Sequence, residues 1–503
     1  MKRIFFLLIA ISFYNNLPAQ TIADALRYST DNTQGTARFA ALSGAFGALG
    51  GDLSSLGFNP AGSSVFLQNQ TGVTLSINQT NNKSNYFNTA SEANHTDFDI
   101  SNAGGVFVFN NYNENSSWKK LAVAINYNNQ AIFDQEIFVT GKTANSIGNY
   151  FLGKAQGTPL DLLQLQAGES ISDLYAYLGE TQGTNTQNAF LGYQGYLFDP
   201  VEENPNNTLY TSNLGTGTYN QEFYNLTNGY KGKYTLNLSA QYTNHLFFGL
   251  NLNAHSINFR QGTFFYETNT NSNSTVKKVE FENHLETIGD GFSFQIGGIV
   301  KVNSQFRVGL AFDSPTWFTI SEETLQYLSS MRIENGESYN AIVDPSVINV
   351  FNEYQLQTPS KIAASAAYIF GKNGLLSVEY SYQDFSKIKF KPTSDPFFIS
   401  ENNSIANKLS TVSTFRVGAE YRIHQLSLRG GFIFEESPYK DLSIVANKTG
   451  GSIGIGYNAG SYNFDVAYSR NLQKKKEPIY LQENSAEIDN VSSSYLFSLN
   501  INL

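Results

Sequence analysis

The segment "SSYLFSLNINL", residues 493–503, alternates apolar and polar side chains up to the last residue of the chain. A period of two is the pattern of a β-strand whose two faces meet different environments. A soluble sheet would carry Lys and Glu on its outer face, whereas the polar side chains here are Ser and Asn. The segment therefore favours a membrane barrel strand, with one face formed by Tyr495, Phe497, Leu499, Ile501 and Leu503.

The same alternation recurs along the chain and gives about fourteen strands. Tight turns at "TNHL", "VNSQ", "GKNG", "RIHQ" and "NAGS" alternate with long connections. An even number of strands with short turns at one end and long loops at the other is typical of bacterial outer-membrane barrels. Such a sheet must close, because a strand edge facing lipid would leave backbone groups unpaired. We expect strands near residues 71–80, 103–111, 118–129, 229–243, 246–265, 288–303, 305–314, 359–371, 374–389, 410–423, 425–435, 449–458, 461–470 and 491–503.

The composition agrees with a membrane barrel. Aromatic residues make up 14% of the chain, with 39 Phe, 30 Tyr and only 2 Trp. Charged residues make up only 15%, where ~25% is usual for a soluble protein. The net charge of −10 argues against nucleic acid as a partner.

The N-terminus predicts an export signal. Lys2 and Arg3 precede the apolar run "IFFLLIAISF", and "NLPAQ" offers a cleavage site near Ala19 or Gln20. The apolar run is shorter than the ~20 residues that a membrane-spanning helix needs. The chain contains no cysteine, so it forms no disulfides and carries no lipoprotein anchor. We expect residues 1–20 to be a signal peptide and 69–503 to form the barrel.

Two long connections predict short helices. Apolar residues at helical spacing occur in "TANSIGNYFLGKAQG" and "PLDLLQLQAGESISDLYAYLGET", and Thr158-Pro159 is a suitable helix start. A further helical fragment is predicted at "SEETLQYLSSMR". The stretches "NNKSNYFNTASEANHTDFDIS" and "NLQKKKEPIYLQENSAEIDNV" are predicted to be long loops. Helical outer loops would cover the barrel mouth, either as simple shielding or as a lid that captures a ligand.

The five histidines do not form a pair with metal-ligand spacing. His255 lies on the polar face of its predicted strand and would point into the lumen, where a lumen-lining role is favoured over a metal or haem ligand. The chain has no Gly-x-Ser-x-Gly elbow, metal-ligand motif or phosphate loop. We therefore expect neither an enzyme nor a cofactor, although His95 and His284 on outer loops leave a Ser/His pair open.

Charged residues on the lumen faces cluster in the late strands. Glu379 lies on one strand, Arg416, Glu420 and Arg422 lie on the next, and Arg429 and Glu435 lie on the one after. Neighbouring strands therefore carry opposite charges. Cross-strand pairing of these charges would brace the wall; the alternative is a role in gating or in binding a substrate carboxylate. The lumen charges on which these interpretations depend are Arg416, Glu420, Arg422 and Arg429.

The segment before the first strand, residues 21–68, does not fit the wall. Its part "GDLSSLGFNPAGSSVFL" is rich in Gly and Ser, yet it carries several large apolar residues. The longer stretch "ARFAALSGAFGALGGDLSSLGFNPAG" resembles the FadL/TodX family of outer-membrane transporters for long-chain fatty acids and other hydrophobic compounds. The family's Asn-Pro-Ala motif corresponds to Asn59-Pro60-Ala61, preceded by an acidic residue, Asp52. "SLRGGFIFEESPYKD" and "TPSKIAASAAYIF" resemble later strands of the family.

This resemblance implies a fourteen-stranded barrel whose N-terminal segment folds back into the lumen as a hatch. It also implies that conformational change in the hatch, and a kink in an early strand opening towards the membrane, let the substrate leave. An apolar ligand site next to the hatch would bind an acyl chain by burial of surface. The hatch residues expected to contact it are Leu56, Phe58, Val65 and Phe66.

The sequence thus predicts an all-β, transmembrane, antiparallel up-and-down barrel of about fourteen strands. Its expected function is passive uptake of hydrophobic molecules such as long-chain fatty acids or hydrocarbons across the outer membrane. Its other partners would be outer-membrane lipid and lipopolysaccharide, and we expect a monomer. Two alternatives remain: a structural or adhesive barrel, favoured by a lumen full of paired charges, and a general porin, favoured by a continuous polar channel.

Overall fold

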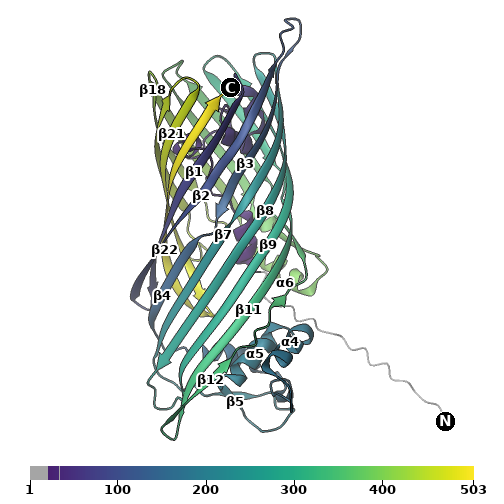
Figure 1. The fold of residues 1–503 in the computed structure, drawn as a ribbon, viewed down its shortest axis with the longest axis vertical. Helices are drawn as coiled ribbons and strands as arrows, with labels where there is room; N and C mark the ends of the chain where they lie inside the picture. Colours follow the sequence, from purple (N-terminus) through teal and green to yellow (C-terminus); the bar gives the residue numbers. More distant parts are fainter. Residues whose placement is uncertain (1–20, 33) are drawn as a thin grey trace, which may run out of the picture.

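The protein is a closed antiparallel β-barrel of fourteen wall strands, with its N-terminal segment inside (Figure 1). The computed structural model describes residues 21–32 and 34–503. The predicted signal peptide, residues 1–20, lies outside the described residues. Every predicted strand falls on a wall strand, so the predicted fold class and strand number are confirmed. No helix in the described ranges is long and apolar enough to span a membrane.

Eleven wall strands are continuous and three are interrupted. The barrel closes where β1 pairs with β22, from Gln70 opposite Asn502 to Asn85 opposite Glu487. The continuous strands are β1 (Gln70–Tyr86), β2 (Thr89–Asn110), β7 (Tyr219–Tyr242), β8 (Leu246–Asn269), β9 (Val276–Lys301), β16 (Gly374–Asp384), β18 (Thr411–Ile423), β19 (Leu426–Glu435), β20 (Lys448–Asn458), β21 (Tyr462–Ile479) and β22 (Leu481–Asn502). The interrupted strands are β3 and β4 (Trp118–Ile132, Gln135–Thr143), β10 and β11 (Phe306–Asp313, Trp317–Glu334), and β14 and β15 (Tyr354–Gln357, Lys361–Ile369).

The short turns lie at the end of the barrel that holds the C-terminus, at the top of Figure 1, and the long connections lie at the opposite end. We call these the short-turn end and the loop end. In outer-membrane barrels they face the periplasm and the cell exterior, respectively. Near the short turns, exposed aromatic side chains form an outward-facing girdle, as expected at a membrane interface: Tyr242, Tyr368, Tyr421, Tyr457 and Tyr462.

Two predicted loops are in fact strands. Residues 81–101 extend β1 and β2 to a tight turn at Phe87 and Asn88, both with positive φ. Residues 471–491 extend β21 and β22 to a turn at Tyr480. Hydrophobic alternation fades in these parts because the outward face carries Asn, Lys and Glu, so the periodic signal is lost although the backbone ladder continues.

The helix predicted at "SEETLQYLSSMR" is also wrong, because residues 321–332 belong to β11 and pair with β9. Pairing along two neighbouring strands overrides a local helical spacing. The long loop 144–218 does contain the predicted helical regions. Its elements are α3 (Gly148–Ala155), η3 (Leu160–Leu162), α4 (Ile171–Thr181), α5 (Thr184–Gln194), β5 (Phe198–Pro200) and β6 (Tyr210–Ser212). Shorter elements complete the loop end: β12 (Glu337–Val343), β13 (Asn349–Val350), η4 (Phe385–Lys387), β17 (Lys389–Lys391) and α6 (Pro396–Lys408).

The loop 144–218 packs across the barrel mouth in one apolar core with the wall. Tyr480, at the tip of the β21–β22 hairpin, reaches this core and lies 5.3–6.0 Å, between ring centroids, from four other aromatic rings. Its hydroxyl lies 3.1 Å from Thr263 Oγ1 on β8. The loop end is therefore covered by packed structure.

The N-terminal segment, residues 21–68, runs through the lumen as α1 (Ile22–Ser29), α2 (Ala37–Ala41), η1 (Leu53–Gly57) and η2 (Pro60–Val65). Side chains cap its short helices: Thr21 and Asp24 form a capping box, and Thr36, Asp52 and Asn59 accept backbone N–H groups. Such caps suit short helices that propensity alone would not hold.

Six wall strands have a lumen-facing glycine where the N-terminal segment touches the wall. A Cβ at any of these positions would lie only 2.2–2.8 Å from an atom of that segment. Glycine is required there because no side chain fits between the two backbones. The six form a ring on β8, β9, β10, β18, β19 and β20: Gly249, Gly297, Gly309, Gly418, Gly431 and Gly454.

This ring predicts that Gly297→Val displaces the N-terminal segment, because the new Cβ would lie 2.2 Å from Asn59 Oδ1. Overpacking of this kind costs about 1–3 kcal/mol. We expect proteoliposomes with the variant to swell in small sugars, and the wild type not to. Gly298→Val is the matched control, because its outward Cβ has no atom nearer than 3.5 Å. A Gly297→Val barrel as tight to sugars as the control contradicts the prediction.

Candidate ligand site in the barrel lumen

The turn Asn59-Pro60-Ala61 fastens the N-terminal segment to the wall. Asn59 Oδ1 accepts the Ala61 N–H at 3.1 Å, and Asn59 Nδ2 donates to Gly47 O at 2.8 Å and Gly298 O at 3.1 Å. Asn59 is buried, so each of these polar atoms needs a partner inside the protein. In this structure the motif joins two parts of the segment and β9.

Of the four apolar residues expected to contact a ligand, only Phe58 lines a cavity described here. Leu56 and Phe66 are buried in a small cluster with residues of β2 and β3. Val65 packs against the cluster that contains Phe247 and Ile299. Phe58 packs against Phe39 in a tilted arrangement, with the ring centroids 4.6 Å apart.

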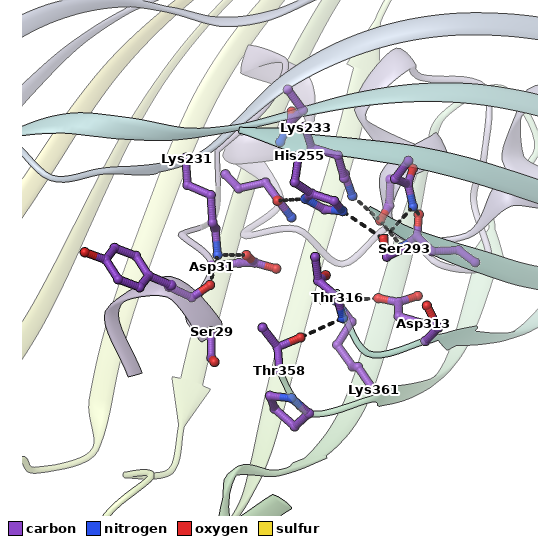
Figure 2. Close-up of a pocket in the computed structure, with 18 of the residues that line it drawn as sticks. Ser29, Asp31, Lys231, Lys233, His255, Ser293, Asp313, Thr316, Thr358 and Lys361 are labelled. Atoms are coloured by element: carbon purple, nitrogen blue, oxygen red, sulfur yellow. Dashed lines mark hydrogen bonds and ion pairs between the residues drawn. The ribbon is translucent and has the colours of Figure 1, made fainter. Parts of the chain in front are cut away.

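Phe58 borders a polar cavity of about 60 Å³ between the N-terminal segment and the wall. Figure 2 shows the lysines and aspartates around it. Its charged and titratable residues come from the segment and from strands β7, β8, β10 and β15: Asp31, Lys231, Lys233, His255, Asp313 and Lys361.

The three lysines of this cavity are not equally paired. Lys231 Nζ lies 2.8 Å from Asp31 Oδ1, and Lys361 Nζ lies 2.8 Å from Asp313 Oδ2. Lys233 Nζ has a backbone acceptor, Gly57 O, at 3.4 Å. Within the described residues it forms no ion pair with a carboxylate. With three ammonium groups against two carboxylates, the cavity suits an anionic group.

The pKa of Asp31 reflects this positive field. Burial alone would raise the pKa of its carboxyl group, but attraction to Lys231 and the other two lysines outweighs burial and holds the pKa below its ordinary value. Asp31 therefore stays ionised at physiological pH and remains paired with Lys231.

His255 points into the lumen, as its strand position predicts. Its Nε2 lies 2.8 Å from Ser293 Oγ and its Nδ1 lies 3.0 Å from Gln130 Oε1. Among the described residues there is no group of three or more His, Cys, Asp or Glu that could hold a metal ion. His255 is a hydrogen-bonded lining residue in this arrangement.

An apolar cluster adjoins the polar cavity on its loop-end side. Helix α1 lies in this cluster and inserts Ile22, Leu26 and Tyr28 among side chains of the wall and of α6. The Tyr28 ring lies 6.2 Å from the rings of Phe133 and Phe259. Tyr28 and Phe318 line the polar cavity as well as the cluster, so the two environments are continuous.

A larger chamber of about 380 Å³ lies beside α1 and reaches the break between β3 and β4 at Phe133 and Asp134. The backbone ladder between β2 and β3 ends at Asn102 and Asn128. Beyond that point β4 pairs with β7, its neighbour on the side away from β2. We call the stretch between residues 89–101 and residues 129–143 the seam.

Three of the four predicted lumen charges, Glu420, Arg422 and Arg429, belong to an ion network near the short-turn end. Glu420 accepts from Arg422 at 2.6 Å, Arg429 at 2.7 Å and Arg38 of the N-terminal segment at 3.1 Å. Arg429 also lies 2.5 Å from Asp465. The interaction with Glu420 outweighs burial and raises the pKa of Arg38.

A second pair, Arg416 with Glu379, lies at 3.2 Å. Glu379 also accepts the Gly47 N–H at 3.0 Å, so both groups of charges hold the N-terminal segment as well as the wall. Arg38 and the cavity lysines were not among the predicted site residues. The alternation along β7 puts Lys231 and Lys233 on the same face as the buried polar residues Thr235 and Asn237. This alternation is the sequence signal that could have identified the two lysines.

The network predicts a large loss of stability for Glu420→Gln, since Arg38 and Arg422 would lose the carboxylate they share. Breaking a buried ion pair costs roughly 3–5 kcal/mol. Glu286→Gln is the matched control, because its pair with Arg260 is exposed on the outer surface and is worth less than about 1 kcal/mol. Urea unfolding in detergent micelles measures both variants, and equal losses would refute the prediction.

The comparisons with known proteins agree with this geometry. A family model described as outer membrane protein transport protein (OMPP1/FadL/TodX) matches residues 215–503. The chain is similar in structure to a FadL homologue of Pseudomonas aeruginosa (TM-score 0.54, 10% identity), with 94% of this chain and 99% of that one covered. It is also similar to the toluene transporters TodX of Pseudomonas putida (TM-score 0.51, 11% identity, 94% and 100% covered) and TbuX of Ralstonia pickettii (TM-score 0.50, 12% identity, 94% and 99% covered).

No curated protein matches the chain. At such low identities the similar structures show the fold, and the family rests on the family model, which covers more than half of the chain. The resemblance found in the sequence is therefore confirmed. The protein belongs to the OMPP1/FadL/TodX family and is a β-barrel transport protein of the outer membrane.

Proposed function

We propose that the protein takes up hydrophobic molecules that carry an acid group, such as long-chain fatty acids, passively across the outer membrane. The observation that carries this proposal is the junction of the lysine cavity with the apolar cluster around α1, through Tyr28 and Phe318. An amphipathic acid needs both environments at once, with its carboxylate on an ammonium group and its chain in apolar surroundings.

The head group would bind at Lys233. Its ammonium is buried without a carboxylate partner among the described residues, and a charge-assisted hydrogen bond to a ligand would supply one. A cavity of about 60 Å³ has room for a carboxylate or for a few waters. Toluene, after which the similar transporters TodX and TbuX are described, has no charge to pair with Lys233.

The acyl chain would take the place of α1. The helix covers its apolar surroundings with Ile22, Leu26 and Tyr28 and is held at its end by Lys231, which donates to Tyr28 O and Thr30 O. A ligand that brings its own apolar chain and acid group offers the cluster and the lysines equivalent contacts. We infer that binding displaces α1 and that residues 21–68 act as the hatch of this family.

The exit would be sideways through the seam. The ring of glycines and Asn59 hold residues 42–60 tightly against the wall at the short-turn end, which disfavours a straight route to the periplasm. The chamber beside α1 reaches the break between β3 and β4. Apolar burial in the membrane would favour release, so no energy input is required.

Contacts with the membrane would differ between the apolar part of the outer wall and the charged part nearer the loop end. Lipid chains would contact the exposed apolar side chains on the outward face of the wall, for example Val466 and Phe497. Nearer the loop end, Lys474 and Lys83 on the outward faces of β21 and β1 are placed to contact anionic groups of lipopolysaccharide. We infer a monomer, since the barrel closes on its own first and last strands.

The general porin remains the alternative and makes a different prediction for small solutes. A porin needs a continuous polar channel past residues 40–66, whereas those residues are mostly buried against the wall. Swelling of wild-type proteoliposomes in small sugars would favour the porin. The ion network at the short-turn end accounts for the paired charges that a purely structural barrel would also contain.

The proposal predicts that Lys233→Met weakens the binding of oleate but not of toluene. Hydrogen bonds to charged groups are worth about 1.5–3 kcal/mol, so we expect oleate to bind roughly 10- to 100-fold more weakly. Lys83→Met is the control, because Lys83 lies on the outward face of β1. Equilibrium binding of both radiolabelled ligands to purified protein measures the effect. A loss of the same size for toluene would show that Lys233 serves structure rather than the acid group.

A further inference from the structure

The seam is bridged by side chains where the backbone ladder is missing. Asn129 Nδ2 on β3 donates to Asp99 Oδ2 on β2 at 2.6 Å. His95 Nε2 lies 4.0 Å from Asp134 Oδ1, across the same gap. Ser91 Oγ also donates to Phe138 O at 2.8 Å, and Asn82 Nδ2 on β1 donates to Glu136 O at 2.7 Å. These side-chain contacts can open without breaking a run of backbone hydrogen bonds, so the seam opens more easily than a strand pair joined by a backbone ladder.

The seam lies in the lipid-facing part of the wall and next to the chamber. Phe98 and Ile100, which alternate with the seam residues of β2, point outward and are 68% and 45% exposed. Asp134 lines the chamber beside α1. A molecule that leaves the chamber through the seam must therefore pass the polar side chains on its two edges.

Those side chains are mostly hydrogen-bond acceptors. Three carboxylates face the gap region, those of Asp97, Asp99 and Asp134. No lysine or arginine pairs with them within the described part of the chain. Their polar partners include the Asn78 and Asn129 amides, the Ile100 N–H and His95.

Two further acceptors, one in the seam and one at the adjoining end of the β2–β3 ladder, have no partner within the described residues. Asn102 Oδ1 and Asn129 Oδ1 are both buried and lack a hydrogen bond. A buried acceptor without a donor is costly, and a passing group that carries an O–H would satisfy it. The nearest chamber cations are already paired: Arg27 with Asp24, Lys448 with Glu435 and Lys475 with Glu477.

We propose that the seam passes the protonated, neutral acid and excludes its anion. A carboxylic acid donates one O–H to an acceptor such as Asn129 Oδ1, whereas a carboxylate only accepts and is repelled by the three aspartates. This inference rests on the proposed uptake of acids. The ligand would bind at the lysine cavity as a carboxylate, take one proton from hydronium in the chamber to give the neutral acid and water, and then leave.

The experiment compares two ligands with the same chain, dodecanoate and dodecyl sulfonate, in proteoliposomes of the full-length protein. The sulfonate stays charged at any accessible pH. We expect both ligands to compete with radiolabelled oleate for binding, and dodecanoate to be transported at least 10-fold faster than the sulfonate. Transport of the sulfonate at the rate of dodecanoate overturns the inference with the wild-type protein alone.

A variant with Asp97→Asn, Asp99→Asn and Asp134→Asn tests the residues. Asparagine keeps an acceptor for Asn129 and His95 but removes the charge, so we expect the sulfonate rate to rise to within about threefold of the dodecanoate rate. The control is Asp489→Asn, which removes the same charge from an exposed pair on β22. A folded triple variant that still excludes the sulfonate overturns the assignment to these aspartates.

The two proposals fail in distinguishable ways. If neither ligand displaces oleate, or neither is transported, the proposed function fails. If both bind and both are transported equally, acid uptake stands and only the selection at the seam is wrong. Circular dichroism and the heat-induced gel shift of folded barrels establish that the triple variant is folded before its transport is measured.

Discussion

The rest of the structure depends on the close contact between the N-terminal segment and the inside of the wall. Six lumen-facing glycines allow the backbone of the segment to touch six strands, and Asn59 hydrogen-bonds to both sides of the contact. Because the segment fills the short-turn end in this way, the two cavities described above lie further towards the loop end. The positions of the cavity, of α1 and of the chamber all follow from that filling.

The lumen consequently has two chemical zones. Near the short-turn end, Arg38, Glu420 and Arg429 form a compact ion network that is satisfied internally. Towards the loop end, Lys233 forms no ion pair with a carboxylate of residues 21–32 or 34–503, and its cavity adjoins an apolar cluster. A charge that is fully paired offers little to a ligand, whereas an incompletely paired one does. This contrast separates the charges that brace the barrel from those that we propose bind a ligand.

The architecture could be predicted from the sequence because lipid and lumen impose opposite polarities on alternate residues over many strands. The prediction failed where that contrast disappears. Residues 81–96 carry mostly polar side chains on both faces, so most of that stretch has no hydrophobic period to detect. The apolar residues of 321–332 have a spacing that fits a helix, but this stretch forms a strand because it pairs with β9.

The candidate site was predictable only in part. Phe58 lines the cavity, but Leu56, Val65 and Phe66 pack against other residues of the segment and the wall. An apolar ligand and an apolar wall select the same residue types, so composition cannot distinguish them. Lys231 and Lys233 occupy positions that alternation assigns to the lumen. Their importance depends on Asp31, Asp313 and Lys361, whose proximity no local pattern reveals.

The position of the N-terminal segment also restricts the order in which the protein can assemble. The Ala37 N–H donates to Ser498 Oγ at 2.7 Å, a contact between residues 461 positions apart. A segment so closely enclosed by wall side chains cannot thread into a cylinder that has already closed. We therefore expect it to lie on the curved sheet before β22 pairs with β1. Insertion of the plug and closure of the barrel would then be one event.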